Sequence, residues 1–131
     1  MSGASKRYLF DTNIFIYYFN GEPILKPLFD EVFSGQSVVL YCPISWVELL
    51  CYPALTTDEA EQIRDFLRRF EQVDLPEAIL DKAAQIRMDY RTALPDAIIA
   101  ACAITTESIL VTRNEDDFNR ISDLAICNPF T

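Results

Sequence analysis

Four acidic positions in this chain follow or begin elements that the sequence pattern defines well. Asp11 ends the apolar run "YLFD", and Asp96 follows Pro95 at the start of an alanine-rich helix. Glu48 lies in the apolar stretch "SWVELL", and the acids of "NEDDF" come after the strand-like "SILVT". Taken singly, each has an ordinary explanation, because acids cap helices, favour first helical turns and occupy solvated loops.

The sequence gives Glu48 two different interpretations. Ser45 and Glu48 have the spacing of a capping box, in which both side chains bond the first turn of a helix. The neighbouring Val47, Leu49 and Leu50 are apolar and indicate a largely buried stretch. A buried carboxylate needs a cation or hydrogen bonds, so Glu48 is also a candidate metal ligand.

Strand-like and helix-like segments alternate along the 131 residues. Alternation of this kind predicts parallel strands joined by helical crossovers, and therefore a single domain over residues 1–131 with an α/β fold of three layers (α/β/α) and a central parallel sheet. The expected strands are 8–11, 37–42, 71–75, 108–112 and 124–129. One helix is expected directly after Asp11, and others are expected over 24–35, 43–53, 57–70, 76–91 and 95–107. Thr57 is the expected cap of the 57–70 helix, and a turn or short helix is expected at 114–121.

In such sheets, ligands bind at the carboxyl ends of the strands, and all four acidic positions are expected at that edge. Clustered carboxylates repel one another, and a hard cation relieves the repulsion. The chain contains no histidine, so Mg²⁺ or Mn²⁺ fits better than zinc. A site of this kind activates water for displacement at phosphorus, which points to hydrolysis of phosphodiester bonds.

Composition excludes several other classes of function. Without histidine, serine–histidine and cysteine–histidine catalysis are excluded, and four widely spaced cysteines argue against a structural zinc site. The net charge of −9 argues against a general nucleic-acid binder and indicates that any protein partner is basic. No apolar run is long enough to span a membrane and no signal-peptide core is present, so we expect a cytoplasmic protein.

Four blocks of the chain resemble, in order, the signature blocks of PIN-domain ribonucleases: "LFDTNIFIYYF", "ISWVELL", "LPDAIIAACAI" and "LVTRNEDDF". The similarity is greatest to the VapC toxins of bacterial type II toxin–antitoxin pairs, and it extends from residue 8 to about residue 127. It implies an α/β/α fold and Mg²⁺- or Mn²⁺-dependent cleavage of RNA. It also implies a homodimer and a small VapB-like antitoxin whose C-terminal segment blocks the active site.

The resemblance also assigns roles to individual residues. Asp11 and Asp96 match the two aspartates of the family's metal site, and Glu48 matches the glutamate between them. The fourth acid corresponds to Asp117, with the adjacent Asp116 as the alternative. Polar positions that support the cluster in the family are matched by Thr12, Thr112 and Asn114.

Basic residues are candidates for contact with the substrate and with partners. Arg113 is the candidate for a phosphate contact, and Arg91 is a weaker one because it is set back from Asp96. The arginines of the 57–70 helix have acids at helical spacing and are expected to form a solvated, paired face. The apolar faces of helices 24–35 and 57–70 are candidate dimer and antitoxin surfaces, although the same faces would also serve as core.

Two other functions remain possible from the sequence. A PIN-like module that only binds a partner would keep the fold without the activity. An α/β phosphatase would place a lysine at a strand end and a second aspartate two residues after Asp11, and the chain has neither.

Overall fold

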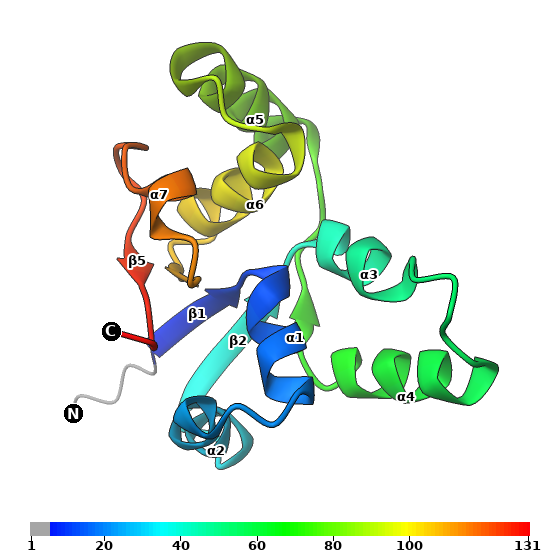
Figure 1. The fold of residues 1–131 in the computed structure, drawn as a ribbon. Coiled ribbons are helices and arrows are strands. Elements are labelled where there is room, and N and C mark those ends of the chain that lie inside the picture. Colours follow the sequence, from blue (N-terminus) through cyan, green and yellow to red (C-terminus); the bar gives the residue numbers. More distant parts are fainter. Residues whose placement is uncertain (1–5) are drawn as a thin grey trace.

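The computed structural model describes residues 6–131, which form a parallel sheet with helices on both faces (Figure 1). The strand order is β3-β2-β1-β4-β5, and every neighbouring pair is parallel. The strands are β1 (Lys6–Phe10), β2 (Ser37–Tyr41), β3 (Glu71–Gln72), β4 (Ile109–Val111) and β5 (Ile126–Cys127). The predicted three-layer α/β/α fold is therefore confirmed.

The helices cover the predicted segments with small differences at their ends. They are α1 (Thr12–Phe19), α2 (Lys26–Phe33), α3 (Pro43–Leu50), α4 (Thr57–Leu67), α5 (Glu77–Tyr90), α6 (Leu94–Thr105) and α7 (Glu115–Phe118), with a 3₁₀ turn (Pro23–Leu25) before α2. None of the helices in residues 6–131 is long and apolar enough to cross a membrane.

Alternating side chains of the strands enter two separate layers of the core. Leu9, Leu40 and Leu110 face α5 and α6, where they pack against small residues such as Ala100. The residues next to these leucines in each strand face the other side of the sheet and pack against aromatic residues of α1, α2 and α4. Figure 1 shows α5, α6 and α7 on one side of the sheet and α1, α2 and α4 on the other. The period of two along each strand thus explains why helices cover both faces.

The chain reverses the direction in which it adds strands between β3 and β4. After β1 it builds β2 and β3 on one side, and then it returns to place β4 and β5 on the other side of β1. The Asp11 amide donates a hydrogen bond to the Val111 carbonyl (3.0 Å), so the ends of β1 and β4 lie together. This is the switch point at which open α/β sheets place their ligands.

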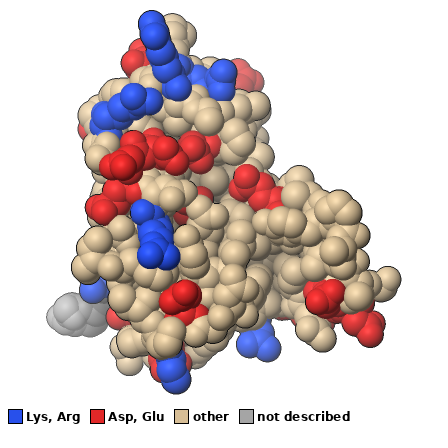
Figure 2. Space-filling view, in the orientation of Figure 1, with Lys and Arg blue, Asp and Glu red and all other residues tan. Residues whose placement is uncertain are grey.

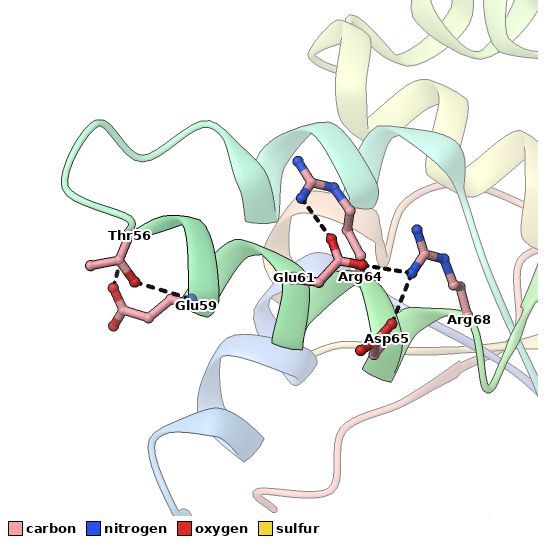
Figure 3. Close-up of polar contacts among 6 residues, drawn as sticks. All are labelled: Thr56, Glu59, Glu61, Arg64, Asp65 and Arg68. Atoms are coloured by element: carbon pink, nitrogen blue, oxygen red, sulfur yellow. Dashed lines mark hydrogen bonds and ion pairs between the residues drawn. The ribbon is translucent and has the colours of Figure 1, made fainter.

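The predicted cap of α4 is wrong by one residue. Thr56, not Thr57, is the N-cap: its hydroxyl accepts from the Glu59 amide (3.1 Å), and the Glu59 carboxylate accepts from the Thr56 amide (2.9 Å) (Figure 3). The reason is the glutamate three positions after Thr56, since a capping box needs that spacing.

Candidate functional site

Asp11 lies at the switch point with both carboxylate oxygens bound. It is 5% exposed and caps α1, where its Oδ1 accepts from the Thr12 amide (2.8 Å). Its Oδ2 accepts from the hydroxyl of Thr112 (2.8 Å), which follows β4. Capping and a place among the clustered acids are therefore compatible roles for Asp11.

Glu48 approaches the same edge from α3. The Thr12 hydroxyl donates to Glu48 Oε1 (2.6 Å) and also lies 2.7 Å from the Ser45 hydroxyl. The capping box expected from Ser45 and Glu48 is wrong: α3 begins at Pro43, with Cys42 at the N-cap, so Ser45 is already inside the first turn. Glu48 therefore uses its carboxylate in a contact with α1 instead of a cap.

Asp96 lies in the first turn of α6 and is partly buried. Burial raises its pKa to about 6, and the negative charges of Asp11, Asp117 and Glu48 add to this effect, in that order. The pKa of Asp11 is also raised, first by burial and further by Glu48 and Asp117, although its bonds from Thr112 and Thr12 oppose the shift. The structure therefore brings the four predicted acids within electrostatic reach of one another.

The electrostatics also separate the two candidates for the fourth acid. Asp117 contributes to the raised pKa of both Asp11 and Asp96, whereas Asp116 contributes to neither. Both residues belong to the one-turn helix α7, which is anchored by the fully buried Phe118. Successive helical side chains point about 100° apart, so only one of the two turns toward the cluster.

The polar residues predicted to support the cluster do so in different ways. The Thr112 hydroxyl is fully buried, donates to Asp11 and accepts from the Asn114 amide (3.0 Å). Thr12 joins Glu48 and Ser45. Asn114 takes part through its backbone, and its side chain is exposed. Ser45 was not anticipated, because its spacing to Glu48 indicated a cap.

The donor set has the chemistry of a site for a hard cation. All four candidate ligands are carboxylates, and two of them have their orientation fixed by threonine hydroxyls. Within residues 6–131, no three acidic or cysteine side chains converge closely enough to enclose an ion by themselves. Mg²⁺ suits such a loose arrangement, because it keeps several of its waters and binds through a few carboxylates.

The two candidate substrate-binding arginines differ in position. Arg113 is exposed and lines a surface hollow of about 320 Å³ with Asn114, Glu115, Asp116 and Asp117. Its guanidinium carbon lies 4.2 Å from the ring centre of Phe130 and 5.0 Å from that of Tyr17, two partners that sequence patterns did not indicate.

Arg91 lies farther back along the chain. It ends α5 in a left-handed conformation (φ 55°), and in the described chain it forms no hydrogen bond or ion pair with the four acids.

Two of the three arginines of the 57–70 helix are paired with acids, as expected, whereas Arg69 forms no ion pair within residues 6–131 and lies over the rings of Phe33 and Phe66. Arg64 and Arg68 both bond Glu61, and Arg68 also bonds Asp65 (2.8 Å) (Figure 3). Figure 2 shows a band of acidic side chains crossing the face over α7, with basic side chains above it and below it.

The candidate partner helices contribute both to the core and to the surface. Phe29 of α2 and Leu67 of α4 are fully buried, so much of each apolar face is core. A surface groove of about 470 Å³ remains beside α4, and it is lined by Tyr18, Phe19, Leu55, Glu59, Gln62, Ile63 and Phe66.

Comparisons with known proteins agree with this architecture. The family model described as PIN domain matches residues 8–124. A chain of a toxin–antitoxin complex from Klebsiella pneumoniae is 30% identical, with a TM-score of 0.78 over 93% of this chain and 97% of that chain. No curated protein matches.

Two further solved structures share the fold at lower identity. VapBC2 from Rickettsia felis, bound to a promoter DNA fragment, is 24% identical, with a TM-score of 0.77 over 93% of this chain and 98% of that chain. VapBC-1 from nontypeable Haemophilus influenzae is 21% identical, with a TM-score of 0.79 over 95% of this chain and 99% of that chain.

Proposed function

This chain belongs to the PIN domain family, as its four sequence blocks indicated, and from that premise we propose that it is a metal-dependent endoribonuclease acting as the toxin of a VapBC-type pair. The observation that carries the proposal is the position of four acids from four separate elements within electrostatic reach of one another at the carboxyl edge of the sheet. Their mutual repulsion helps to raise the pKa of Asp96 to about 6. An arrangement that costs stability in this way is typical of a functional site.

The proposed cofactor is Mg²⁺ or Mn²⁺, held by Asp11, Glu48, Asp96 and Asp117. When bound, the cation supplies Lewis-acid activation of water and of the scissile phosphate. The protein's own part is to hold the carboxylates: Thr112 orients Asp11, and Thr12 orients Glu48. Because both hydroxyls are buried, these orientations are fixed before the substrate arrives.

RNA is the proposed substrate, on the basis of the resemblance and the phosphodiester chemistry of the acids. Arg113 is the proposed phosphate contact, because it lines the same hollow as Asp117. The net charge of −9 makes general affinity for nucleic acid weak. Weak general affinity suits a nuclease that selects a structured RNA by its shape and loop sequence.

The proposed partners are a basic VapB-like antitoxin and a second copy of this chain. The similar chain from Klebsiella pneumoniae belongs to a toxin–antitoxin complex, and the acidic edge would attract a basic arm. An arginine of that arm would insert among the site carboxylates, and an apolar segment would fit the groove beside α4. Asp96→Asn should weaken antitoxin binding measured by calorimetry, and unchanged affinity would contradict the inserted arm.

The decisive experiment is cleavage of a total-RNA pool by the purified protein with Mg²⁺ or Mn²⁺. Discrete fragments are expected, and they should disappear with a chelator and in Asp96→Asn. Asp117→Asn and Asp116→Asn form a matched pair of equal charge: the first should abolish cleavage and the second should retain most of it. Equal loss in both would contradict the assignment of Asp117.

Failure to cut RNA would point to the other candidate. A protein that binds Mg²⁺ and antitoxin but cleaves no RNA under any of these conditions would be a partner-binding PIN module.

A further inference from the structure

Arg113 lies over a pair of contacting aromatic rings that come from opposite ends of the chain. Tyr17 belongs to α1, and Phe130 lies in the last residues, after β5. The two ring centres are 5.1 Å apart at an angle of 61°, and the guanidinium lies within 5.0 Å of each. A cation over aromatic faces at this distance is held by attraction to the rings.

Arg113 forms no ion pair within residues 6–131, although acids occupy positions 115–117. The ion pairs of residues 6–131 involve Lys26, Arg64 and Arg68, and the side chain of Arg113 donates no hydrogen bond within that range. Contact with the rings engages no N–H donor of the guanidinium in a hydrogen bond within residues 6–131. The five N–H donors therefore remain available to a ligand.

The end of the chain is fastened in the position that this contact requires. The Thr112 amide donates to the Cys127 carbonyl (3.0 Å), which ties the end of β5 to the end of β4. Asn128 donates to Glu115 of α7 (2.9 Å) and accepts from the Phe130 amide (2.9 Å). The segment that presents Phe130 is thus bonded to the same short helix that carries Asp117.

We propose that Tyr17 and Phe130 hold Arg113 as a preorganised clamp for a backbone phosphate of the RNA strand, beside the four acids. Arg113 contacts the substrate, and the two aromatic residues are positioning residues. Contact with two rings favours one position of the guanidinium over pairing with the nearby Glu115 and Asp116, and it leaves the N–H donors free for bidentate contact with phosphate. The proposal rests on the proposed function, because it needs an RNA substrate.

The test compares Arg113→Ala, Phe130→Ala, Phe130→Trp and the double variant Arg113→Ala/Phe130→Ala. Phe33→Ala is the matched control: Phe33 is an exposed ring under another arginine, Arg69, at 5.9 Å. The readouts are kcat and KM for an RNA cut in the total-RNA experiment, at several salt concentrations. Urea unfolding of each variant confirms that it is folded.

Loss of one phosphate contact should appear in KM and in the salt dependence. Arg113→Ala should raise KM about tenfold with little change in kcat, and it should reduce the slope of log(kcat/KM) against log[salt] by about one. Phe130→Ala should raise KM by roughly two- to fivefold, the range of an exposed cation–π contact, and Phe130→Trp should restore it. The double variant should be no worse than Arg113→Ala, and Phe33→Ala should behave as wild type.

Other outcomes would overturn the clamp. An unchanged KM and an unchanged salt slope in Arg113→Ala would show that Arg113 does not contact the RNA. A further loss on adding Phe130→Ala to Arg113→Ala would show that Phe130 acts independently of Arg113 and does not position it.

A binding assay separates failure of the clamp from failure of the nuclease. It uses the fluorescently labelled total-RNA pool of the cleavage experiment and the Asp96→Asn protein. Binding that depends on Arg113 and Phe130 would support the clamp even without cleavage, and absence of such binding would overturn it. Cleavage that does not depend on Arg113 or Phe130 would support the proposed nuclease and contradict the clamp.

Discussion

The carboxylate of Asp11 depends on two hydrogen bonds for its place in the protein. Burial disfavours its charge, and the donors Thr12 and Thr112 oppose that effect, yet its pKa remains raised. One donor is the backbone amide of Thr12, and the other is the side-chain hydroxyl of Thr112, which follows β4. The second bond can therefore be removed by a substitution that leaves the backbone alone.

Thr112→Val keeps the shape of the side chain and removes only its hydroxyl. Asp11 Oδ2 and the Asn114 amide both lose a partner, so the free energy of unfolding should fall by about 1–3 kcal/mol, and metal affinity should weaken. Urea unfolding and calorimetric titration with Mg²⁺ measure the two effects. Thr112→Ser keeps the hydroxyl and should recover most of both, and equal losses in the two variants would contradict the role of the hydroxyl.

The pKa of Asp96 predicts opposite effects of pH on stability and on metal binding. Between about pH 4 and about pH 6 the folded state keeps a proton that the unfolded chain has released, so the metal-free protein loses stability as pH rises. The loss is on the order of 1 kcal/mol once solvent screening of this partly buried group is considered. Metal affinity should instead rise with pH until it levels off above about pH 6.

Asp96→Asn provides the control for this pH dependence. Urea unfolding of the metal-free variant should change less between pH 4 and 7 than that of the wild type. A variant as pH-dependent as the wild type would assign the effect to other groups, Asp11 first.

Sequence reasoning selected the four acids because each follows a strand or lies in an early turn of a helix that follows one, and such positions meet at one edge of a parallel sheet. It could not choose between Asp116 and Asp117, because that choice depends on how one turn of α7 is rotated. It also missed Phe130, whose contact with Arg113 exists only after β5 has paired with β4. Local patterns contain neither kind of information.

At the scale of elements, the start of α4 offers a matched pair of neighbouring threonines. Thr56→Ala removes the side-chain half of the capping box and should lower the free energy of unfolding by about 1 kcal/mol. Thr57→Ala alters a helical residue that is not the cap and should change stability by a few tenths of a kcal/mol at most. Chemical denaturation measures both, and RNA cleavage should be unaffected. Equal losses would contradict the assigned cap.

Long periodic helices were predicted well, and short elements were not. The apolar period of 57–70 and the small residues of 95–107 correspond to α4 and α6 within a few residues. The strands β3 and β5 are only two residues long, shorter than the runs that suggested them. Strand-forming residues after Asp11 nevertheless form α1, because Asp11 caps it and Phe15 packs into the aromatic core.

For the whole molecule, metal binding and stability should be coupled. A cation that relieves repulsion among four acids binds only the folded chain, so Mg²⁺ at ten times its Kd should raise the free energy of unfolding by about 1.4 kcal/mol. The midpoint of thermal unfolding should rise by about 5 °C. Asp96→Asn should show a smaller rise at the same concentration, and an equal rise would place the cation elsewhere.

The bond between Asp11 and Thr112 joins positions 101 apart in the chain. During synthesis, β2 is available to pair with β1 early, whereas β4 and α7 are made after both of them. A nascent chain that stops before residue 109 already carries Asp11, Glu48 and Asp96, yet it lacks the strand that supplies Thr112 and the helix that supplies Asp117. A fragment that ends before residue 109 would therefore contain three of the four acids and lack the paired strands on whose edge they meet.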